Sequence, residues 1–335
     1  MSEINRREFM EKAATVTGAL ALGAAAAPTL AADQKNDKAA KPDKAGSKPA
    51  AAKPPTLRRA TDKVTLGKTG ISCSLLGIGT GSIGYNHQSN QTRLGQAKFT
   101  ELVRHAFDRG VTFFDVADAY GSHPYLKEAI KGLPRDKFII QSKIIHRSAD
   151  EARADLDRFR KELGVDYIDI VLMHVVTEPD WNTRFAGVKD VLSEAKQKGI
   201  IRAHGCSCHS LAALETAAKD PWVEVDLARY NPWGKHMDNR RGAPESDAPR
   251  NVTPVLKEMR ASGKGVIGMK ILAQGDMMNG DDRRARARES LRFGLGSGVL
   301  NAFVIGFESP AQIDELLDDT RVALADLAKI GPQTA

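Results

Sequence analysis

Four side chains that can hold or move a proton stand at the ends of three successive apolar runs. Asp115 and Tyr120 lie in FFDVADAY, Lys143 ends FIIQSK, and His174 ends YIDIVLMH. A short apolar run that stops on a titratable residue brings that residue to the rim of a sheet. Taken singly, these residues are a helix cap, a core tyrosine, a rim lysine and an interior histidine. Together they predict one rim that carries acid–base chemistry.

The spacing of these residues indicates how the rim is built. Tyr120 and Lys143 are 23 residues apart, and Lys143 and His174 are 31 apart. One strand, one helix and two loops need about 30 residues. The intervening segments HPYLKEAIKGL and SADEARADLDRFRKEL have helical patterns. We therefore predict parallel strands whose carboxyl ends form the site.

Eight apolar runs of this kind can be counted, which predicts an α/β fold of the (β/α)8 TIM barrel type. The runs are CSLLGIG, VTFFDVA, KFIIQSK, YIDIVLMH, IIRAHGC, VDLARYN, GVIGMKI and NAFVIGF. Ahead of them, KVTLGKTGISCS predicts an N-terminal β-hairpin at the barrel bottom. Ser309-Pro310 predicts an N-cap and first turn for the last helix. The rival fold, a doubly wound sheet, expects a phosphate loop, and GIGTGSIGY continues into no immediate helix.

The first 57 residues carry signals of a different kind. Arg6-Arg7 with Phe9, the stretch AATVTGALALGAAAAP and a cleavage-like site near Ala31 resemble a twin-arginine (Tat) export signal over residues 1–32. Residues 33–57 are rich in Lys, Ala and Pro, which predicts a disordered linker. The barrel is predicted over residues 58–325, with a tail at 326–335. This organisation predicts a periplasmic protein that engages the Tat translocon and keeps no stable membrane span after cleavage; the alternative is a cytoplasmic protein.

The charge and cysteine counts exclude other classes. Residues 33–63 carry nine Lys or Arg and four Asp or Glu, so most of the net charge of +7 lies there. The predicted barrel is nearly neutral, which gives no reason to expect a nucleic-acid partner. The three cysteines do not form a disulfide framework. Cys206-Ser207-Cys208-His209 lacks the spacing and the second cysteine pair of a usual zinc knuckle, so no metal is predicted.

Several of these motifs resemble the aldo/keto reductase family over roughly residues 63–320. FFDVADAYG is similar to the family signature Phe-Asp-Thr-Ala-x-x-Tyr-Gly, with Val116 in place of Thr. LGKTGISCSLLGIGTG resembles the family's opening hairpin and first strand, and SKIIH and DIVLMH resemble its Lys and His strands. The resemblance implies a (β/α)8 barrel, a monomer, and NAD(P)H-dependent reduction of small-molecule aldehydes or ketones.

The resemblance also implies four catalytic roles. Tyr120 would be the general acid, and Lys143 would lower the pKa of its phenol, which is near ~10 in the free side chain. Asp115 would hold Lys143 charged and in place. His174 would donate a hydrogen bond that orients the carbonyl oxygen.

The cofactor positions depart from the family pattern. Cys208 stands where the family often has an Asn that holds the nicotinamide carboxamide, and Leu227 stands where a Gln is usual. Met269 replaces a stacking Tyr and can still pack against a ring. The residues predicted to contact the cofactor are Gly79, Thr80, Gly81, Ser207, Met269, Lys270, Glu308 and Gln312.

The choice between NADH and NADPH depends on the end of the last strand. Where the family often has cations for the 2′-phosphate, this chain has Gly306 and Gln312, with Glu308 between them. A carboxylate repels a phosphate and accepts ribose hydroxyls, so the sequence leans towards NADH. Arg283 or Arg284 would be the cations able to compensate.

The substrate pocket is predicted from aromatic residues after the strands. Tyr85, Trp181 and Trp233 are candidate walls, each with core packing as the alternative. The long charged stretch 231–250 predicts either a lid or a disordered loop. Two other functions stay open: a metal-dependent hydrolase, which would need a His-x-His pair absent after the first strand, and a non-catalytic barrel that acts as a binding module.

Overall fold

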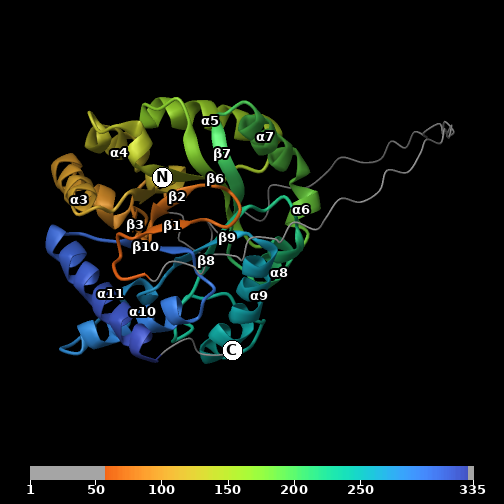
Figure 1. The fold of residues 1–335 in the computed structure, drawn as a ribbon. Helices are drawn as coiled ribbons and strands as arrows, with labels where there is room; N and C mark the ends of the chain where they lie inside the picture. Colours follow the sequence, from red (N-terminus) through yellow and green to blue (C-terminus); the bar gives the residue numbers. More distant parts are fainter. Residues whose placement is uncertain (1–56, 331–335) are drawn as a thin grey trace, which may run out of the picture. The chain divides into compact units, whose positions relative to one another are not determined.

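The eight apolar runs form the eight strands of one closed barrel (Figure 1). The computed structural model describes residues 57–330, so the predicted signal peptide and nearly all of the linker lie outside the described residues. All neighbouring strands of the barrel are parallel, in the order β10-β3-β4-β5-β6-β7-β8-β9. The bounds are β3 Leu76–Gly79, β4 Phe113–Asp115, β5 Ile139–Ile144, β6 Ile168–Val176, β7 Ile201–Cys208, β8 Val225–Arg229, β9 Gly265–Met269 and β10 Ala302–Gly306. The predicted (β/α)8 barrel is therefore confirmed.

Helices surround the strands, as the outer ring of Figure 1 shows. They are α2 Asn90–Arg93, α3 Gln96–Asp108, α4 His123–Ile130, α5 Ala149–Leu163, α6 Trp181–Arg184, α7 Ala186–Gln197, α8 Leu211–Lys219, α9 Ala248–Ser262, α10 Arg283–Gly296 and α11 Pro310–Ile330. Short 3₁₀ turns are η1 Asp118–Tyr120, η2 Arg135–Lys137, η3 Glu245–Asp247 and η4 Ala273–Gly275. The last helix continues past residue 325, the end predicted for the barrel. Within residues 57–330, no helix is both long enough and apolar enough to cross a membrane.

Local sequence signals set the helix ends. Ser148 accepts a hydrogen bond from the amide of Glu151 and so caps the start of α5. Gly164 ends that helix in the left-handed region at φ 67°, which glycine adopts without a steric penalty. Ser309 accepts a hydrogen bond from the amide of Gln312, so the cap predicted for the last helix is confirmed.

Strand alternation separates two apolar layers. Every second residue points into the barrel, and the residues between them point towards the helices. The interior cluster takes side chains from seven of the eight barrel strands, among them Phe113, Ile139, Leu172, Ala203 and Val304. The larger cluster fills the space between strands and helices. Both clusters consist of apolar side chains, so a polar side chain in either one needs an explanation.

The predicted hairpin is formed by β1 Lys63–Thr65 and β2 Ser72–Ser74, which pair antiparallel. Leu66, Ile71 and Cys73 from this hairpin belong to the interior cluster, so the hairpin covers the barrel's N-terminal end. The amide of Lys68 donates to the carbonyl of Gly263 at 2.8 Å and so attaches the hairpin to the end of α9. The opposite end of the barrel is left for the site.

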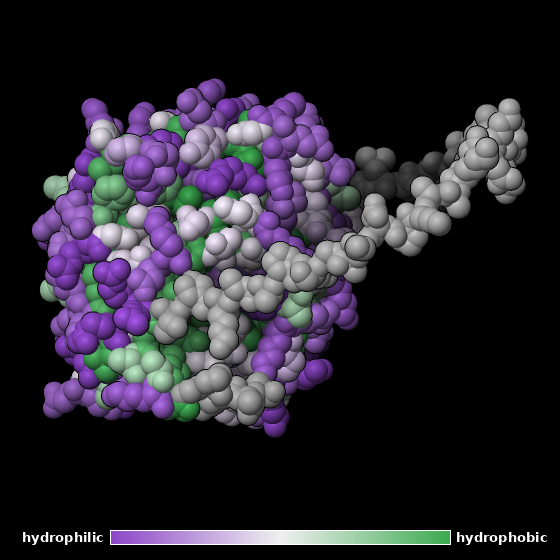
Figure 2. All heavy atoms as spheres, viewed as in Figure 1, coloured by the Kyte–Doolittle hydropathy of each residue, from purple (hydrophilic) through white to green (hydrophobic). Residues whose placement is uncertain are grey.

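The stretch 231–250 is ordered rather than disordered, and it is tied to the barrel mouth. Asp238 is buried and accepts a hydrogen bond from Arg229 at the end of β8, at 2.6 Å. The side-chain Nδ2 of Asn231 donates to the carbonyls of Lys235 and Lys270. The visible face of the molecule is mostly hydrophilic, with hydrophobic residues in scattered patches (Figure 2).

Candidate active site

The four strand-end residues of the sequence meet at the C-terminal mouth of the barrel. Asp115 ends β4, Lys143 lies near the end of β5, and His174 lies near the end of β6, each in step with the inward-facing residues of its strand. Tyr120 follows β4 on the short turn η1. Because the strands are parallel, their carboxyl ends open on the same side, and the side chains contact one another.

A buried ion pair lies at the centre of this group. Lys143 is fully buried, and its ammonium lies 2.5 Å from Asp115 Oδ1 and 3.0 Å from the carbonyl of Val116. Gln141 donates to the same carboxylate oxygen at 2.8 Å. Burial lowers the pKa of Lys143, and the negative charge of Asp115 opposes that effect. The carboxylate thus keeps a desolvated lysine charged.

Tyr120 lies between this ion pair and His174. Its hydroxyl oxygen is 3.3 Å from His174 Nε2, and the Lys143 ammonium lies 4.8 Å from the centre of the phenol ring. Burial, followed by the charge of Asp115, raises the pKa of Tyr120 well above its ordinary value. The sequence predicts the opposite net direction, because strand-end spacing does not show how deeply the phenol is desolvated. The phenol therefore holds its proton at neutral pH, as a general acid must.

His174 is neutral. Burial lowers its pKa well below the ordinary value, and the positive charges of Lys143 and Arg147 lower it further. Nε2 contacts the Tyr120 hydroxyl, whereas the buried Nδ1 has no hydrogen-bond partner among residues 57–330. A neutral imidazole can orient a carbonyl oxygen without competing with Tyr120 as the acid.

Arg147, which sequence reasoning missed, holds the backbone beside His174. Its guanidinium donates to the carbonyls of His174 and Val175, and burial lowers its pKa to about 10. Val175 has φ 54°, a strained value for a β-branched residue, at the point where the pairing of β6 with β7 shifts register. Such strain persists only where the surroundings fix it. Arg147 is therefore a positioning residue for His174.

Two glycines give the loop after β3 close access to the tyrosine. A Cβ at Gly81 would lie 2.4 Å from the Tyr120 ring, and one at Gly84 would lie 2.5 Å from it. Gly121, at φ 63°, has the carbonyl of His87 only 2.0 Å from its Cβ position. The glycines of GIGTGSIGY thus let the loop pack flat against the acid.

The predicted cofactor residues differ in what their side chains do. Ser207 is fully buried, and its hydroxyl has no hydrogen-bond partner among the described residues. An orphaned hydroxyl at this end of the barrel fits the predicted contact with a carboxamide. Thr80 instead hydrogen-bonds the Asp115 carbonyl and the Ser122 hydroxyl, both at 2.9 Å, so it holds the end of β4 in place. Met269 ends β9 beside the interior cluster.

The end of β10 forms a small polar network. Glu308 is exposed and accepts a hydrogen bond from Asn90 at 2.6 Å, while the side chain of Gln312 accepts one from the Glu308 amide at 2.8 Å. A Cβ on Gly306 would lie 2.1 Å from Ser82 Oγ, so glycine allows the β3 loop to approach. Lys270 follows β9 with φ 58°.

The two arginines named as compensating cations are already paired. Arg283 forms two hydrogen bonds with Glu315, at 2.6 and 2.8 Å. Arg284 contacts Asp318 and Asp319. Both side chains thus bind the acidic face of α11.

Of the two interpretations left open for Trp181, the structure supports core packing. Trp181 is fully buried in the strand–helix layer, and its indole donates to the carbonyl of Ala213, so it is a core residue. Its position after a strand end resembles a pocket wall, but α6 turns it inward. Tyr85 and Trp233 remain partly exposed.

A residue that sequence reasoning missed is His209, whose ring centre lies 6.1 Å from that of His174. Its place directly after an apolar run was the available signal.

The comparisons with known proteins agree with this geometry. The family model for the aldo/keto reductase family matches residues 75–328, and the chain belongs to this family. It is 26% identical over 200 residues to an Escherichia coli NADH-specific methylglyoxal reductase, covering 53% of this chain and 61% of that protein. It is 31% identical over 191 residues to the Bacillus subtilis aldo-keto reductase YhdN, covering 52% of this chain and 55% of that protein. The matches thus span less than two thirds of these relatives.

A solved structure gives the same fold. An aldo-keto reductase from Pseudomonas aeruginosa superposes with a TM-score of 0.63 at 24% identity, covering 79% of this chain and 97% of that one. At this identity the likeness establishes the barrel and no more.

We predict that Gly81→Ala lowers kcat/KM for carbonyl reduction without unfolding the protein. The new Cβ displaces the Tyr120 ring, and a misplaced catalytic group of this kind costs about 10²-fold in kcat/KM. The control is Gly187→Ala on the exposed face of α7, where the nearest contact would be 3.3 Å. Thermal unfolding measures the stability of the two variants, and steady-state kinetics measures their kcat/KM. Near wild-type kcat/KM in Gly81→Ala would show that the loop does not set the tyrosine.

The pKa directions predict a flat pH profile for carbonyl reduction near neutrality. His174 is neutral because its pKa lies below the ordinary value, and Tyr120 stays protonated because its pKa lies above it. Between about pH 6.5 and pH 9, neither group changes charge. The measurement is kcat/KM against pH. An inflection in this range that disappears in His174→Gln would contradict the neutral assignment.

Proposed function

We propose that this protein reduces aldehydes or ketones to alcohols with NAD(P)H, with Tyr120 as the general acid. The observation that carries the proposal is the contact of four groups at one barrel mouth. A protonated phenol lies against a neutral imidazole on one side and a buried lysine–aspartate pair on the other.

Each residue has a definite part in the chemistry. The nicotinamide, when bound, supplies a hydride to the carbonyl carbon. Tyr120 gives its proton to the carbonyl oxygen as negative charge develops there. The Lys143 ammonium, held by Asp115, stabilises the phenolate that remains. His174 positions the carbonyl oxygen beside the phenol.

The cofactor fits the residues present. Ser207 offers an unpaired hydroxyl to the carboxamide, and Met269 offers a polarisable side chain to the nicotinamide ring. Glu308 places a carboxylate near the end of β10, where a 2′-phosphate would be repelled. The proposal therefore favours NADH over NADPH; the names of the relatives include an NADH-specific enzyme from Escherichia coli and an NADP(+) enzyme from Saccharomyces cerevisiae.

Tyr120→Phe tests the catalytic part. We expect kcat for a small carbonyl such as methylglyoxal to fall by about 10²–10⁴-fold, because the proton donor is removed. The dissociation constant for NADH should change little, because the phenol hydroxyl supplies no cofactor contact in the proposal. Stopped-flow hydride transfer and fluorescence titration of NADH measure the two quantities. An unchanged kcat would remove Tyr120 from the mechanism and favour a binding module.

The same titration, run with NADPH, tests the role of Glu308. Wild-type protein should bind NADH more tightly, and Glu308→Gln should improve NADPH affinity about fivefold while leaving NADH nearly unchanged. Gln312→Glu is the reciprocal variant and should weaken NADPH binding further. NADPH binding tenfold tighter than NADH in the wild type would overturn the preference.

We also propose that the chain is exported through the Tat pathway and acts outside the cytoplasm. The support is Arg6-Arg7 with the apolar stretch behind it, in residues outside the described part of the chain. Replacing Arg6 and Arg7 by Lys keeps the charge, and we expect it to retain the protein in the cytoplasm on cell fractionation. The matched control is the pair Arg58-Arg59 replaced by Lys. Export that persists without the twin arginine would contradict the Tat route, whereas wild-type protein found in the cytoplasm would favour the cytoplasmic alternative.

A further inference from the structure

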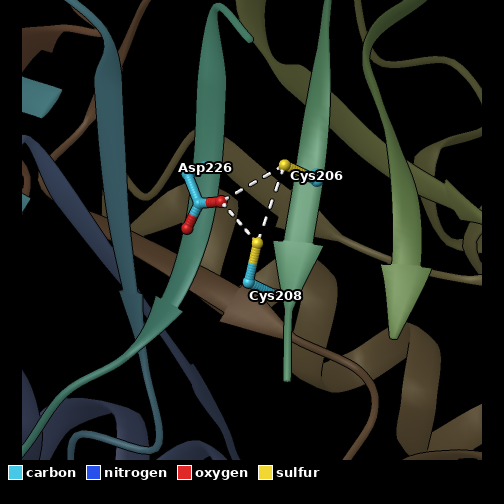
Figure 3. Close-up of side chains that lie close together, drawn as sticks. All are labelled: Cys206, Cys208 and Asp226. Carbon is cyan, nitrogen blue, oxygen red and sulfur yellow. Dashed lines mark hydrogen bonds between the residues drawn. The ribbon is translucent and has the colours of Figure 1, made fainter. Parts of the chain in front are cut away.

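Two thiols and a carboxyl group meet between β7 and β8, outside the active site (Figure 3). Cys206 Sγ lies 3.5 Å from Asp226 Oδ2, Cys208 Sγ lies 3.4 Å from the same oxygen, and the two sulfurs are 3.7 Å apart. All three residues are fully buried. The proposed reduction uses none of them.

The strands bring these groups together by register. Cys206 pairs with Asp226 across the parallel strands, and Cys208 lies two residues further along the same face of β7. Both cysteines belong to the cluster between strands and helices, so the group faces away from the barrel interior. The third group comes from the neighbouring strand, so the Cys-x-Cys spacing does not reveal it.

The two thiols contact only one oxygen of the Asp226 carboxyl group, Oδ2. Asp226 Oδ1 is buried and has no hydrogen-bond partner among residues 57–330, and no ion pair is formed by Asp226 within that range. The nearby Lys264 directs its ammonium to the carbonyls of Asp220 and Val223. Burial raises the pKa of Asp226 to about 7 and that of Cys206 to about 11. Burying a carboxyl group in an apolar layer with one unpaired oxygen costs free energy of folding unless a ligand compensates for it.

We propose that Cys206, Cys208 and Asp226 form a binding site for a thiophilic divalent cation of the Zn²⁺ class. Tetrahedral Zn²⁺ has bonds of about 2.3 Å to sulfur and about 2.0 Å to oxygen, which sets donor separations of about 3.8 Å and about 3.5 Å. The observed triangle of 3.7, 3.5 and 3.4 Å matches one face of that tetrahedron. The site supplies three protein ligands and leaves the fourth position open.

Ligand chemistry selects the cation. Thiolates prefer Zn²⁺ and other soft ions to Mg²⁺ or Ca²⁺, which take oxygen ligands. Binding releases the two thiol protons and any proton on Asp226. Two thiolates and one carboxylate then surround a cation of charge +2.

A second acidic group shows what a compensated cluster looks like. Asp118, His123 and Glu162 also bring their polar atoms close together. There the Arg158 guanidinium lies 2.6 Å from Asp118 and 3.0 Å from Glu162, so a cation from the protein already neutralises the carboxylates. The group at Cys206 has no such partner.

The proposed cation site and the proposed cofactor site share strand β7. Ser207 lies between the two cysteines in β7, and strand alternation turns its hydroxyl to the barrel interior. A cation behind the strand would fix the backbone that presents Ser207 to the cofactor. This consequence rests on the proposed function, whereas metal binding itself does not.

The test is metal content and metal spectroscopy of the untagged protein. Because the site is buried, Zn²⁺ or Cd²⁺ is supplied during production and again during refolding, followed by desalting. We expect about one Zn²⁺ per chain by mass spectrometry of the element, and a thiolate-to-Cd²⁺ charge-transfer band in the ultraviolet. Cys206→Ser, Cys208→Ser and Asp226→Asn should each lower occupancy at least tenfold.

Cys73→Ser is the matched control, because Cys73 is equally buried but lies in the hairpin at the barrel bottom. It should keep full occupancy and the full Cd²⁺ band. The wild-type Cd²⁺ spectrum decides the matter even if a variant fails to fold. No thiolate band in the wild type, or metal that stays in folded Cys206→Ser, would overturn the site and leave a hydrogen-bonded trio of neutral groups.

Discussion

The pairing of Lys143 with Asp115 is the interaction on which the rest of the site depends. A lysine with no exposed surface would lose its charge if it were unpaired, because burial lowers its pKa. Three groups prevent this: the Asp115 carboxylate, the Gln141 amide that holds the carboxylate, and the Val116 carbonyl. Such a pair contributes little to stability after desolvation. Its value is a positive charge fixed beside Tyr120, in a place where water cannot screen it.

The strand positions were predictable because the barrel buries strands on both faces, which gives continuous apolar runs. For the same reason, a polar residue at the end of a run was informative, and Asp115, Lys143 and His174 do converge. What the sequence could not show depends on contacts between distant segments. Arg147 reaches the carbonyl of His174 from another loop, and Asp226 joins Cys206 and Cys208 across a strand boundary. No local pattern encodes either contact.

The sequence left Trp181 open between pocket wall and core for a related physical reason. An aromatic residue after a strand can face the barrel mouth or pack under the next helix. The identity of the residue does not distinguish these two positions. The indole of Trp181 finds its partner in the carbonyl of Ala213, which the sequence places far away. The direction of the Tyr120 pKa shift was missed because desolvation depends on how closely Gly81 and Gly84 allow the loop to approach.

Strand β7 carries residues of both proposed sites. Its inward face carries Ser207 to the barrel mouth, and its outward face carries Cys206 and Cys208 into the helix layer. Because side chains alternate along a strand, a shift that moves the two sulfurs also moves the hydroxyl between them. His174 lies on β6, which pairs with β7 at Met173–Cys206 and Val176–Cys208, whereas Asp115 and Lys143 lie on β4 and β5. A shift of the two cysteines would therefore reach Ser207 and the β6 backbone beside His174 before it reached Asp115 or Lys143.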